Sequence, residues 1–572
     1  SVSRGLGDVY KRQIGNVNTD RGGSLYLTYS GNRASDIKLQ IIGGHKIPYL
    51  ELNDFHKISE TEAKERIRNF IIELTEYNPY NLPGNKEIQN LNHTEISLPN
   101  ILLSLPATKV LDGINEGVST QEEKVEKMYK NVQSWEELMG VMYKTHGIDD
   151  HKNNSLQTRN NIRYMKMFSG AFMYAAGNHI GVPYGSASGL MNGKPTTDIA
   201  SGQEQNNLFG WGIAHEIGHV MDKLGKTEIT NNIYSLMGQT YDGKINILKS
   251  RLELSNVYEK AFKKVSDGKE GVPNDVFTHL AMYWQLHLAY DDADNPFKFY
   301  NELHKQYKGQ NLGDINNFAI AASKIANKDL TEFFTRWGVD LSEQAKTEIS
   351  KLPKEDRAIY YLNDESRRQR LNNNSGNKNI NVEANAKLQQ SQDSENDKAK
   401  EVLITITSKS DNVQGYEILR KGSSDKEFKP IGFTTTNTYT DYIGSANNLT
   451  FTYAIKPIDV LGNISPQKEI GQVRISYDNT IEKSLYTIDE KTGIVTFTEP
   501  TIVTGIKVTP KGNEKMPTGT YKVYADIVDN IAPTSSQTTN DGFILAKDGN
   551  FANNFATEPN TYINLSLIHI WR

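Results

Sequence analysis

The sequence predicts a multidomain protein in which an α+β domain, mainly helical around its candidate site, is followed by β-sandwich modules. At 572 residues the chain is too long for one hydrophobic core, and its length suggests three or four domains. Between about residues 119 and 361, apolar residues recur at three- and four-residue spacing, which is the periodicity of amphipathic helices. After residue 399, short β-branched and aromatic runs recur at the spacing typical of a β-sandwich.

The part of the chain before residue 108 is expected to be rich in strands. Within residues 14–107, glycine-bounded runs alternate between Gly22 and Leu50, a helical period follows from about Thr61 to Tyr77, and a strand-like piece ends near Ala107. Residues 1–13 and 565–572 resemble nothing around them and look like translated adaptor sequence. We therefore expect both ends to be non-native tails and the natural chain to be longer.

Residues 108–362 are expected to form the main, largely helical domain. One exception to the helical pattern is Ala171–Ala176, whose sequence AFMYAA predicts a single strand ahead of the central helices. The helices are predicted at Ser134–Tyr143, Leu208–Leu224, Glu228–Gln239, Val276–Tyr290 and Phe297–Tyr307.

The C-terminal part of the chain is expected to hold two β modules behind a polar connection. Residues 363–398 are dense in Asn, Gln, Ser, Lys and Asp, a composition that favours a linker or long surface loop. In residues 399–475 the run YTD…TYAIKPIDVLGN resembles part of a fibronectin type III-like sandwich. Residues 476–564 are expected to be a truncated β-sandwich that resembles a carbohydrate-binding, discoidin-like module.

The overall composition excludes several classes of protein. A net charge of -5 lacks the basic excess that nucleic-acid binding requires. There is no run of 18 apolar residues, so no transmembrane segment is predicted. The chain has 0 cysteines, which excludes a disulfide scaffold, a thiolate metal site and a cysteine nucleophile.

The segment that carries chemistry contains the pattern HExxH, formed by His215, Glu216 and His219 with two residues between. Residues four apart lie on one face of a helix, so both imidazoles can reach one metal ion. Glu216 is offset from His215 by about 100° around the helix, which leaves it beside the metal as a candidate base. Zinc held by three protein ligands keeps a position for water and lowers its pKa to about 7.

The third ligand is predicted to come from the segment after this helix. Gly225 is expected as a left-handed cap after Leu224, and Glu228 follows at the expected start of a second helix. A helix, a tight turn and a carboxylate on the next helix can bring Glu228 back to the ion. Two imidazoles and one carboxylate are a known catalytic zinc set, so we predict one Zn²⁺ held by His215, His219 and Glu228.

The segment WGIAHEIGHVMD…GKTEITNNIYSL resembles the enhancin and mucin-targeting family of gluzincin metallopeptidases, and the likeness extends over about residues 20–362. The resemblance implies a zinc endopeptidase with Glu216 as catalytic base. It also implies glycoprotein substrates, particularly mucin-type O-glycosylated ones. An extracellular or cell-surface location and glycan binding through the C-terminal modules are expected with it.

Further candidates surround the motif. Asn231 and Asn232 either orient a ligand or only cap and pack a helix. Trp211 walls the site, stacks on a sugar or packs in the core. Phe172, Met173 and Tyr174, with Ala175, are expected to form an edge strand for an extended peptide substrate, the alternative being an interior strand. The candidate oxyanion donors are His279, Tyr283, His287 and Tyr290, which otherwise are core or exposed polar residues.

Two other functions remain open from the sequence. One is a carbohydrate-binding adhesin whose peptidase-like domain is a scaffold, although such a scaffold is expected to lose Glu216 or a ligand. The other is a zinc hydrolase that acts on other peptides, such as those of the bacterial wall.

Overall fold

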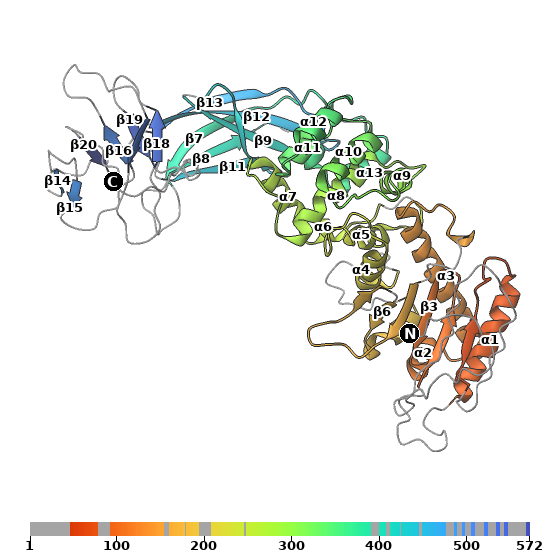
Figure 1. Cartoon of the computed structure of the whole chain (residues 1–572). Helices are drawn as coiled ribbons and strands as arrows, with labels where there is room; N and C mark the ends of the chain where they lie inside the picture. The colour runs from red at the N-terminus through yellow and green to blue at the C-terminus, as the bar shows by residue number, and fades with distance from the viewer. Residues whose placement is uncertain are drawn as a thin grey trace, which may run out of the picture. The chain divides into compact units, whose positions relative to one another are not determined.

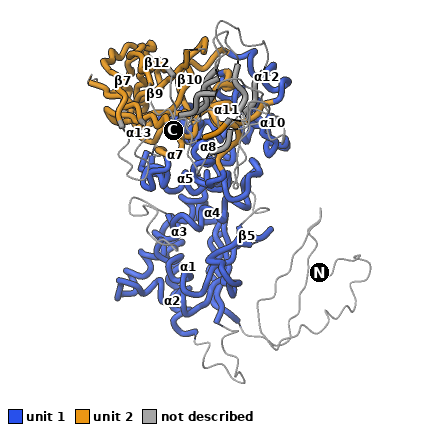
Figure 2. The backbone as a smooth tube through the Cα atoms, turned by 90° about the vertical axis from the view of Figure 1, so that its left-hand side faces the viewer, with its two compact units in different colours: residues 1–257, 274–328, 342–352 blue, residues 258–273, 329–341, 353–572 orange. Residues whose placement is uncertain are grey.

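The computed structural model (Figure 1) shows two compact units, coloured separately in Figure 2. The first unit comprises residues 1–257, 274–328 and 342–352, and the second comprises 258–273, 329–341 and 353–572. The residues that the structure describes are 46–77, 92–153, 160–177, 179–193, 208–244, 247–390, 400–407, 412–423, 425–444, 449–475 and short strands beyond residue 485.

The first unit contains a six-stranded mixed sheet in the order β1-β2-β3-β4-β6-β5. β2 pairs antiparallel with β3, and β5 antiparallel with β6, while the other neighbours are parallel. Ile96, Leu103, Ile162 and Ile180 stand opposite one another across four strands, and each is at most 1% exposed. The strands are β1 (Tyr49–Glu51), β2 (Thr94–Ser97), β3 (Ile101–Leu105), β4 (Asn160–Tyr164), β5 (Tyr174–Ala176) and β6 (His179–Val182).

Three helices accompany the N-terminal strands of this unit: α1 (Glu60–Glu76), α2 (Ala107–Asn115) and α3 (Gln121–Thr145). α1 and α3 lie side by side (Figure 1). α3 begins at a capping box in which Thr120 accepts from the N–H of Glu123 and the Glu123 side chain accepts from the N–H of Thr120. Further along α3, the indole of Trp135 stacks on Phe209 with ring centroids 3.7 Å apart, next to the helix that carries the HExxH motif.

The rest of the first unit is helical. α4 packs on α5, and both contact α3. α8 is buried on nearly every side, which explains why its sequence is apolar all round rather than in one stripe. The helices are α4 (Gly210–Met221), α5 (Asn232–Thr240), α6 (Arg251–Leu254), α8 (Val276–Tyr290), α9 (Lys298–Gln306), α10 (Ile315–Ala326) and α12 (Glu343–Ile349).

The predicted helices of this unit are confirmed, with shifted ends at several of them. The structure adds strands β4 and β6, which the sequence did not predict, because both are short and adjoin polar or glycine-rich stretches. The strand-like piece that ends near Ala107 is confirmed as β2 and β3. Most of the strands expected between Gly22 and Leu50 lie outside the described residues.

The second unit contains two antiparallel sheets that share one hydrophobic core. One sheet has the order β11-β8-β7 and the other β10-β9-β12-β13. Ile404 from the first sheet and Ile418, Tyr453 and Ile455 from the second are fully buried in this core. The strands are β7 (Ala384–Gln390), β8 (Lys400–Ile406), β9 (Val413–Gly422), β10 (Lys429–Thr434), β11 (Thr438–Gly444), β12 (Leu449–Asp459) and β13 (Lys468–Ile475).

Three short helices belong to the second unit: α7 (Val257–Ser266), α11 (Thr331–Arg336) and α13 (Asp364–Leu371). Tyr361 stacks on Phe433 of β10 at 3.9 Å, and Arg336 pairs with the buried carboxylate of Glu417 at 2.7 Å. Parts of the range 108–362, expected to be one domain, thus pack with the β-strands.

The range 363–398, expected to be a linker, contains α13 and β7, so that prediction was wrong for these segments. β7 pairs with β8 over its whole length. Its small or apolar residues Ala384, Ala386 and Leu388 alternate with polar ones and pack against the core. The polar composition of residues 363–398 as a whole concealed the alternation of apolar and polar residues in β7.

Beyond residue 485 the structure describes short paired strands only. β14 pairs with β15, β16 with β19 and β20, and β17 with β18. The fibronectin type III-like and carbohydrate-binding identities of the C-terminal modules stay predictions. Among the described helices, none combines the length and the apolar character that crossing a membrane requires. The strands are β14 (Tyr486–Ile488), β15 (Val495–Phe497), β16 (Gly505–Val508), β17 (Thr520–Val523), β18 (Thr534–Gln537), β19 (Phe543–Ala546) and β20 (Ile568–Trp571).

Candidate active site

Helix α4 presents the HExxH motif with one face anchored in the core. Ile213 and Ile217 are 0% exposed, so the helix cannot rotate without exposing them. On the other face, the side chains of His215 and His219 keep 19% and 20% of their surface accessible. The helix therefore holds two imidazoles at a surface while its apolar side fixes their direction.

The side chains of His215, His219 and Glu228 converge and form a triangle of potential metal ligands, the ligand triangle. Nε2 of His215 lies 3.1 Å from Nε2 of His219. Nε2 of His215 also lies 3.3 Å from Oε2 of Glu228, and Nε2 of His219 lies 3.3 Å from Oε1 of the same carboxylate. Bonds of about 2.0–2.1 Å in a tetrahedral arrangement place ligand atoms about 3.3–3.4 Å apart. The spacing and the N,N,O donor set fit a zinc-sized ion without rearrangement of the chain.

Glu228 reaches this triangle from a turn, and not from the start of a helix as expected. α4 ends at Met221 and α5 begins at Asn232. In the turn between them, the N–H groups of Ile229 and Thr230 both donate to the carbonyl of Lys226. Glu228 itself has a φ of 68°, which is unusual for a residue with a side chain.

Gly225 has the expected left-handed conformation, with a φ of 69°. However, it lies within the connection and does not cap the helix, because Asp222 occupies the position after Met221. The helix is thus shorter than its apolar pattern suggested, and the freed residues make the turn that returns Glu228 to the histidines.

A hydrogen-bonded clasp that the sequence reasoning missed closes this connection. The hydroxyl of Thr230 donates to Oδ2 of Asp222 at 2.6 Å, and the N–H of Leu224 donates to Oδ1 at 2.9 Å. The N–H of Lys226 donates in turn to the Thr230 hydroxyl at 3.1 Å. Burial raises the pKa of Asp222, which these bonds partly offset. In the sequence, the only signal for this clasp was an Asp directly after the HExxH helix and a Thr shortly before the following helix.

Asn232 connects two of the ligands. Its Oδ1 lies 2.7 Å from Nδ1 of His215, so it accepts a hydrogen bond when that nitrogen carries the proton, which leaves the Nε2 lone pair free for a metal. Its Nδ2 donates to the backbone carbonyl of Glu228 at 2.7 Å. The structure thus brings Asn232 to the position expected of a residue that orients a ligand.

Asn231 also faces the triangle. Its side-chain amide lies 3.4 Å from Nε2 of His215 and 3.2 Å from Nε2 of His219. Its other terminal atom, Oδ1, is buried without a hydrogen-bond partner in the described part of the chain.

Glu216 lies beside the triangle and is 6% exposed. Burial, followed by the nearby charge of Glu228, raises the pKa of Glu216 to about 7. A carboxylate with such a pKa can both take up and release a proton near neutral pH, which is the property required of a general base that later acts as an acid.

These residues line a cleft with the edge strand β5. The cleft walls include Met173, Tyr174 and Ala175 together with His215, Glu216, His219 and Glu228. Among the described residues β5 has a hydrogen-bonded neighbour, β6, on one side only, so an edge strand is present, although Phe172 and Met173 of the expected strand lie outside it. Gly181 of β6 leaves room for the Tyr174 ring, since a Cβ there would lie 2.9 Å from Cδ1 of Tyr174. Phe172 lies outside this lining and is 48% exposed.

The remaining candidates do not reach the cleft lining. Trp211 is 8% exposed and packs against Phe277 and Arg251, so its position is that of a core residue. Tyr283 and His287 are at most 2% exposed, and His287 pairs with the equally buried Asp291.

The other two candidate oxyanion donors pack elsewhere. Burial lowers the pKa of His279 to about 4, with a further contribution from Lys226. Tyr290 stacks on Phe299. The structure therefore favours the alternative, in which these four polar residues of α8 pack within the domain, and the oxyanion donor stays unassigned.

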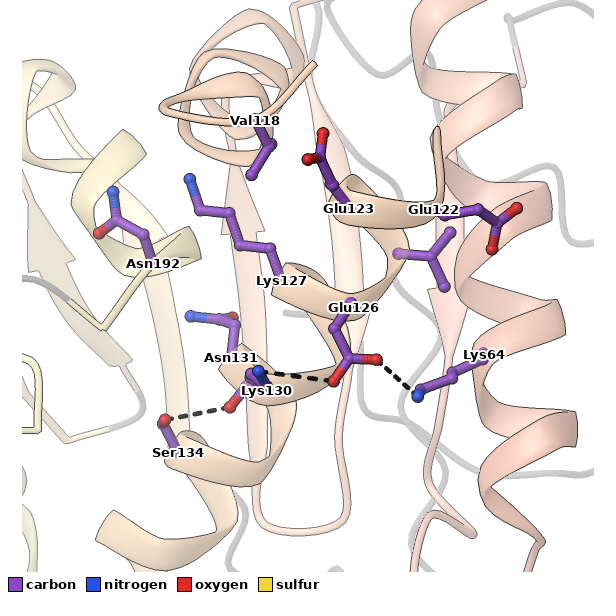
Figure 3. A pocket seen from close by; sticks show the side chains of 11 residues that line it. Lys64, Val118, Glu122, Glu123, Glu126, Lys127, Lys130, Asn131, Ser134 and Asn192 are labelled. Carbon is purple, nitrogen blue, oxygen red and sulfur yellow. Dashed lines mark hydrogen bonds and ion pairs between the residues drawn. The ribbon is translucent and has the colours of Figure 1, made fainter. Parts of the chain in front are cut away.

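A different pocket, between α1 and α3, is shown in Figure 3. Glu126 of α3 forms ion pairs there with Lys64 of α1 and with Lys130. Its lining holds charged surface side chains and none of the residues of the HExxH cleft, so it is not the candidate active site.

Comparison with known proteins relates this part of the chain to a family and to solved structures. Residues 111–338 match the family model described as Peptidase M60, enhancin and enhancin-like. The M60 catalytic domain of Clostridium perfringens ZmpC, solved in complex with the sialyl T antigen, is similar at 23% identity and a TM-score of 0.51, over 75% of this chain and 76% of that one. The ZmpB metallopeptidase of the same organism has 22% identity and a TM-score of 0.51, over 74% and 76% of the two chains.

A curated relative from Danio rerio, a TRPM8 channel-associated factor homolog, is 27% identical over 192 residues. That match covers 32% of this chain and 20% of the relative, so this chain spans about a fifth of that protein's length.

The family match and the cluster of His215, Glu216 and His219 together support a metallopeptidase domain in residues 111–338. Residues 111–338, which are less than half of the chain, match the enhancin-like Peptidase M60 family. The resemblance inferred from the sequence is thereby confirmed, and the fold of the solved M60 catalytic domains agrees with it.

Proposed function

We propose that this protein is a secreted, zinc-dependent endopeptidase of the gluzincin type that hydrolyses glycoproteins, with mucin-type O-glycosylated proteins as its main substrates. The observation that carries the proposal is the ligand triangle of His215, His219 and Glu228 in one cleft with Glu216 and the edge strand β5. A metal centre next to a strand edge that has no partner in the described part of the chain is suited to a substrate that binds as an extended peptide.

When bound by the three ligands, zinc would supply a Lewis acid that polarises a peptide carbonyl and acidifies water. The chain's own residues do the rest. The free backbone edge of β5 pairs with the substrate backbone and aligns the scissile bond along the cleft. Asn232 holds His215 in the tautomer that ligates. Glu216 accepts the proton of the attacking water and passes it to the leaving amine.

The glycoprotein part of the proposal has two supports. The ZmpC catalytic domain, which has a similar fold, was solved with the sialyl T antigen bound. In this chain, Phe168 lines the cleft with 62% of its surface exposed, and its ring lies 5.6 Å from that of Tyr174. Such an exposed aromatic face at a substrate cleft is suited to pack against a sugar ring. The C-terminal β modules are proposed to bind glycans and keep the enzyme near its substrate.

Cleavage of an O-glycosylated mucin and of its deglycosylated form tests the proposal, with the protein, its Glu216→Gln variant and a chelator-treated sample. We expect the protein to cut the glycosylated form, the chelator to stop cleavage, and Glu216→Gln to bind zinc without cutting. Cleavage of both forms would remove the sugar from specificity. Zinc and mucin binding without cleavage would favour the adhesin, and cleavage of wall peptides alone would favour the other hydrolase.

A further inference from the structure

A second cluster of metal-ligating side chains lies in the first unit, on residues outside the HExxH cleft. It consists of His56 from the segment after β1, Glu136 from α3, and His151 from η3 (His151–Asn153). One candidate ligand atom from each residue lies within 4.8 Å of the other two. The three residues are 80 and 15 positions apart in sequence, so only the fold brings them together.

The geometry of the cluster is close to that of a metal site. Nε2 of His56 lies 2.6 Å from Oε2 of Glu136, and Nε2 of His151 lies 4.0 Å from the same oxygen. One distance is shorter and the other longer than the spacing of about 3.3–3.4 Å between ligands of a tetrahedral zinc ion. Side-chain movements of about 0.7 Å would bring both to that spacing, which is within the range of small χ rotations.

Glu136 is the buried centre of the cluster, with 4% of its surface exposed. Its Oε2 receives a hydrogen bond from Nδ2 of Asn100 at 3.1 Å in addition to the contact with His56. Its Oε1 is buried and has no hydrogen-bond partner in the described part of the chain. An ionised carboxylate with one unpartnered buried oxygen is expensive, and a cation bound through both oxygens would satisfy it.

The surroundings leave room for such an ion. A Cβ on Gly140, one turn after Glu136 on α3, would lie 2.9 Å from Cε1 of His151, so glycine is what lets this imidazole approach the helix. The cluster opens to a pocket that is also lined by Glu137, Lys144 and Lys152. In that lining two carboxylates face two ammonium groups, so the local charge is balanced before any ion binds.

We propose that His56, Glu136 and His151 form a second metal site that binds a divalent transition-metal ion of the Zn²⁺ class. Two imidazoles and a carboxylate are ligands that favour such ions over Mg²⁺ or Ca²⁺, which prefer oxygen alone. The ion is structural: it fastens the segment after β1 and the turn at His151 to α3. The site is separate from the HExxH cleft, and its existence does not depend on the proposed peptidase activity.

Metal content measured on the full chain tests this proposal. After loading with Zn²⁺ and removal of free metal, we expect two bound equivalents in the wild type and one in His215→Ala/His219→Ala. His56→Asn/His151→Asn should also retain one equivalent. One equivalent in the wild type and none in His215→Ala/His219→Ala would overturn the proposal, because the cluster would then be only a hydrogen-bonded carboxylate.

A second measurement guards against variants that fail to fold. In the His215→Ala/His219→Ala background, Zn²⁺ should raise the thermal unfolding midpoint, and Glu136→Gln should abolish the rise while preserving the shape of the side chain. Glu137→Gln is the matched control, since it removes a neighbouring carboxylate from the same pocket. Equal loss in both variants, or no rise at all, would show that no specific ion binds here.

Discussion

Gly218, the fourth residue of the HExxH motif, allows the helix and the ligand turn to touch. A Cβ placed on Gly218 would lie 3.0 Å from the carbonyl carbon of Asn231 and still closer to its oxygen. Gly238 belongs to α5 and faces both α3 and α4. A Cβ there would lie 3.6 Å from the nearest atom, Cε of Met142 on α3, and 3.7 Å from Cβ of Ala214 on α4. Gly218 thus packs directly against backbone and leaves no space for a side chain, whereas Gly238 leaves space for a methyl group.

The Gly218→Ala substitution should therefore damage the site. Carbon and carbonyl atoms pack best at about 3.5–4.0 Å, so the backbone of Asn231 would have to retreat by about 1 Å or more, because its carbonyl oxygen is the nearest atom. Overpacking of this kind costs about 1–3 kcal/mol of folding free energy. Because Asn231 adjoins Asn232, the same retreat disturbs the residue that orients His215. Loss of such support lowers metal affinity about 10–100-fold, and a displacement of about 1 Å can lower the rate about 100-fold.

Gly238→Ala provides the matched control. Its methyl group meets ordinary van der Waals neighbours, and alanine in a helix interior is favoured over glycine by about 1 kcal/mol. We expect Gly238→Ala to unfold at the same or a higher temperature and to keep its zinc affinity and its cleavage rate. Gly218→Ala should lose zinc affinity and cleavage. Chelator competition and a cleavage assay measure the two effects. Wild-type affinity and rate in Gly218→Ala would refute the reasoning.

Three further outcomes are expected. Glu228→Asn should raise the stability of the metal-free protein by about 0.5–1 kcal/mol in denaturant unfolding, because Asn tolerates a φ of 68°, yet it should abolish tight zinc binding. Thr230→Val should lower stability by about 1–3 kcal/mol and weaken zinc binding, since it leaves the buried Asp222 short of a donor; unchanged unfolding would contradict the clasp. Burial lowers the pKa of His304 to about 3 and that of His146 to about 4. As the pH falls, the unfolded chain takes up protons on these histidines before the folded protein does. The free energy of unfolding should therefore fall below about pH 6.5, by up to about 1.4 kcal/mol per pH unit for each histidine. In His304→Asn, the thermal unfolding midpoint should depend less on pH than in the wild type.

The fold was predictable from sequence where local periodicity and tertiary packing agree. α8 has the bounds predicted for it, Val276–Tyr290, because its apolar residues continue to both ends. β7 was missed because half of its residues are polar and only Ala384, Ala386 and Leu388 face the core. The assignment of residues 258–273 and 329–341 to the second unit depends on long-range packing, which no local pattern reveals.

The candidate metal ligands were predictable for a different reason. Helical geometry alone aligns His215 with His219, and a carboxylate at a suitable distance follows along the chain. The turn that presents Glu228, the Asp222–Thr230 clasp and the role of Gly218 depend on backbone angles and close contacts that residue types do not encode. His56, Glu136 and His151 do not follow any motif spacing in the sequence, because each of them comes from a different segment of the fold.

The strained backbone of Glu228 is held in place by a hydrogen bond from Asn232. A residue with a side chain in the left-handed region costs about 1–2 kcal/mol, and such a conformation persists only where its surroundings fix it. Here the carbonyl of Glu228 accepts from Asn232, whose other amide atom contacts His215. One side chain therefore sets the position of a ligand on the turn relative to a ligand on the helix. The candidate ligand atoms can then stand at metal spacing although two separate elements supply them, and the side chain that orients the imidazole also donates the hydrogen bond that offsets the strain at Glu228.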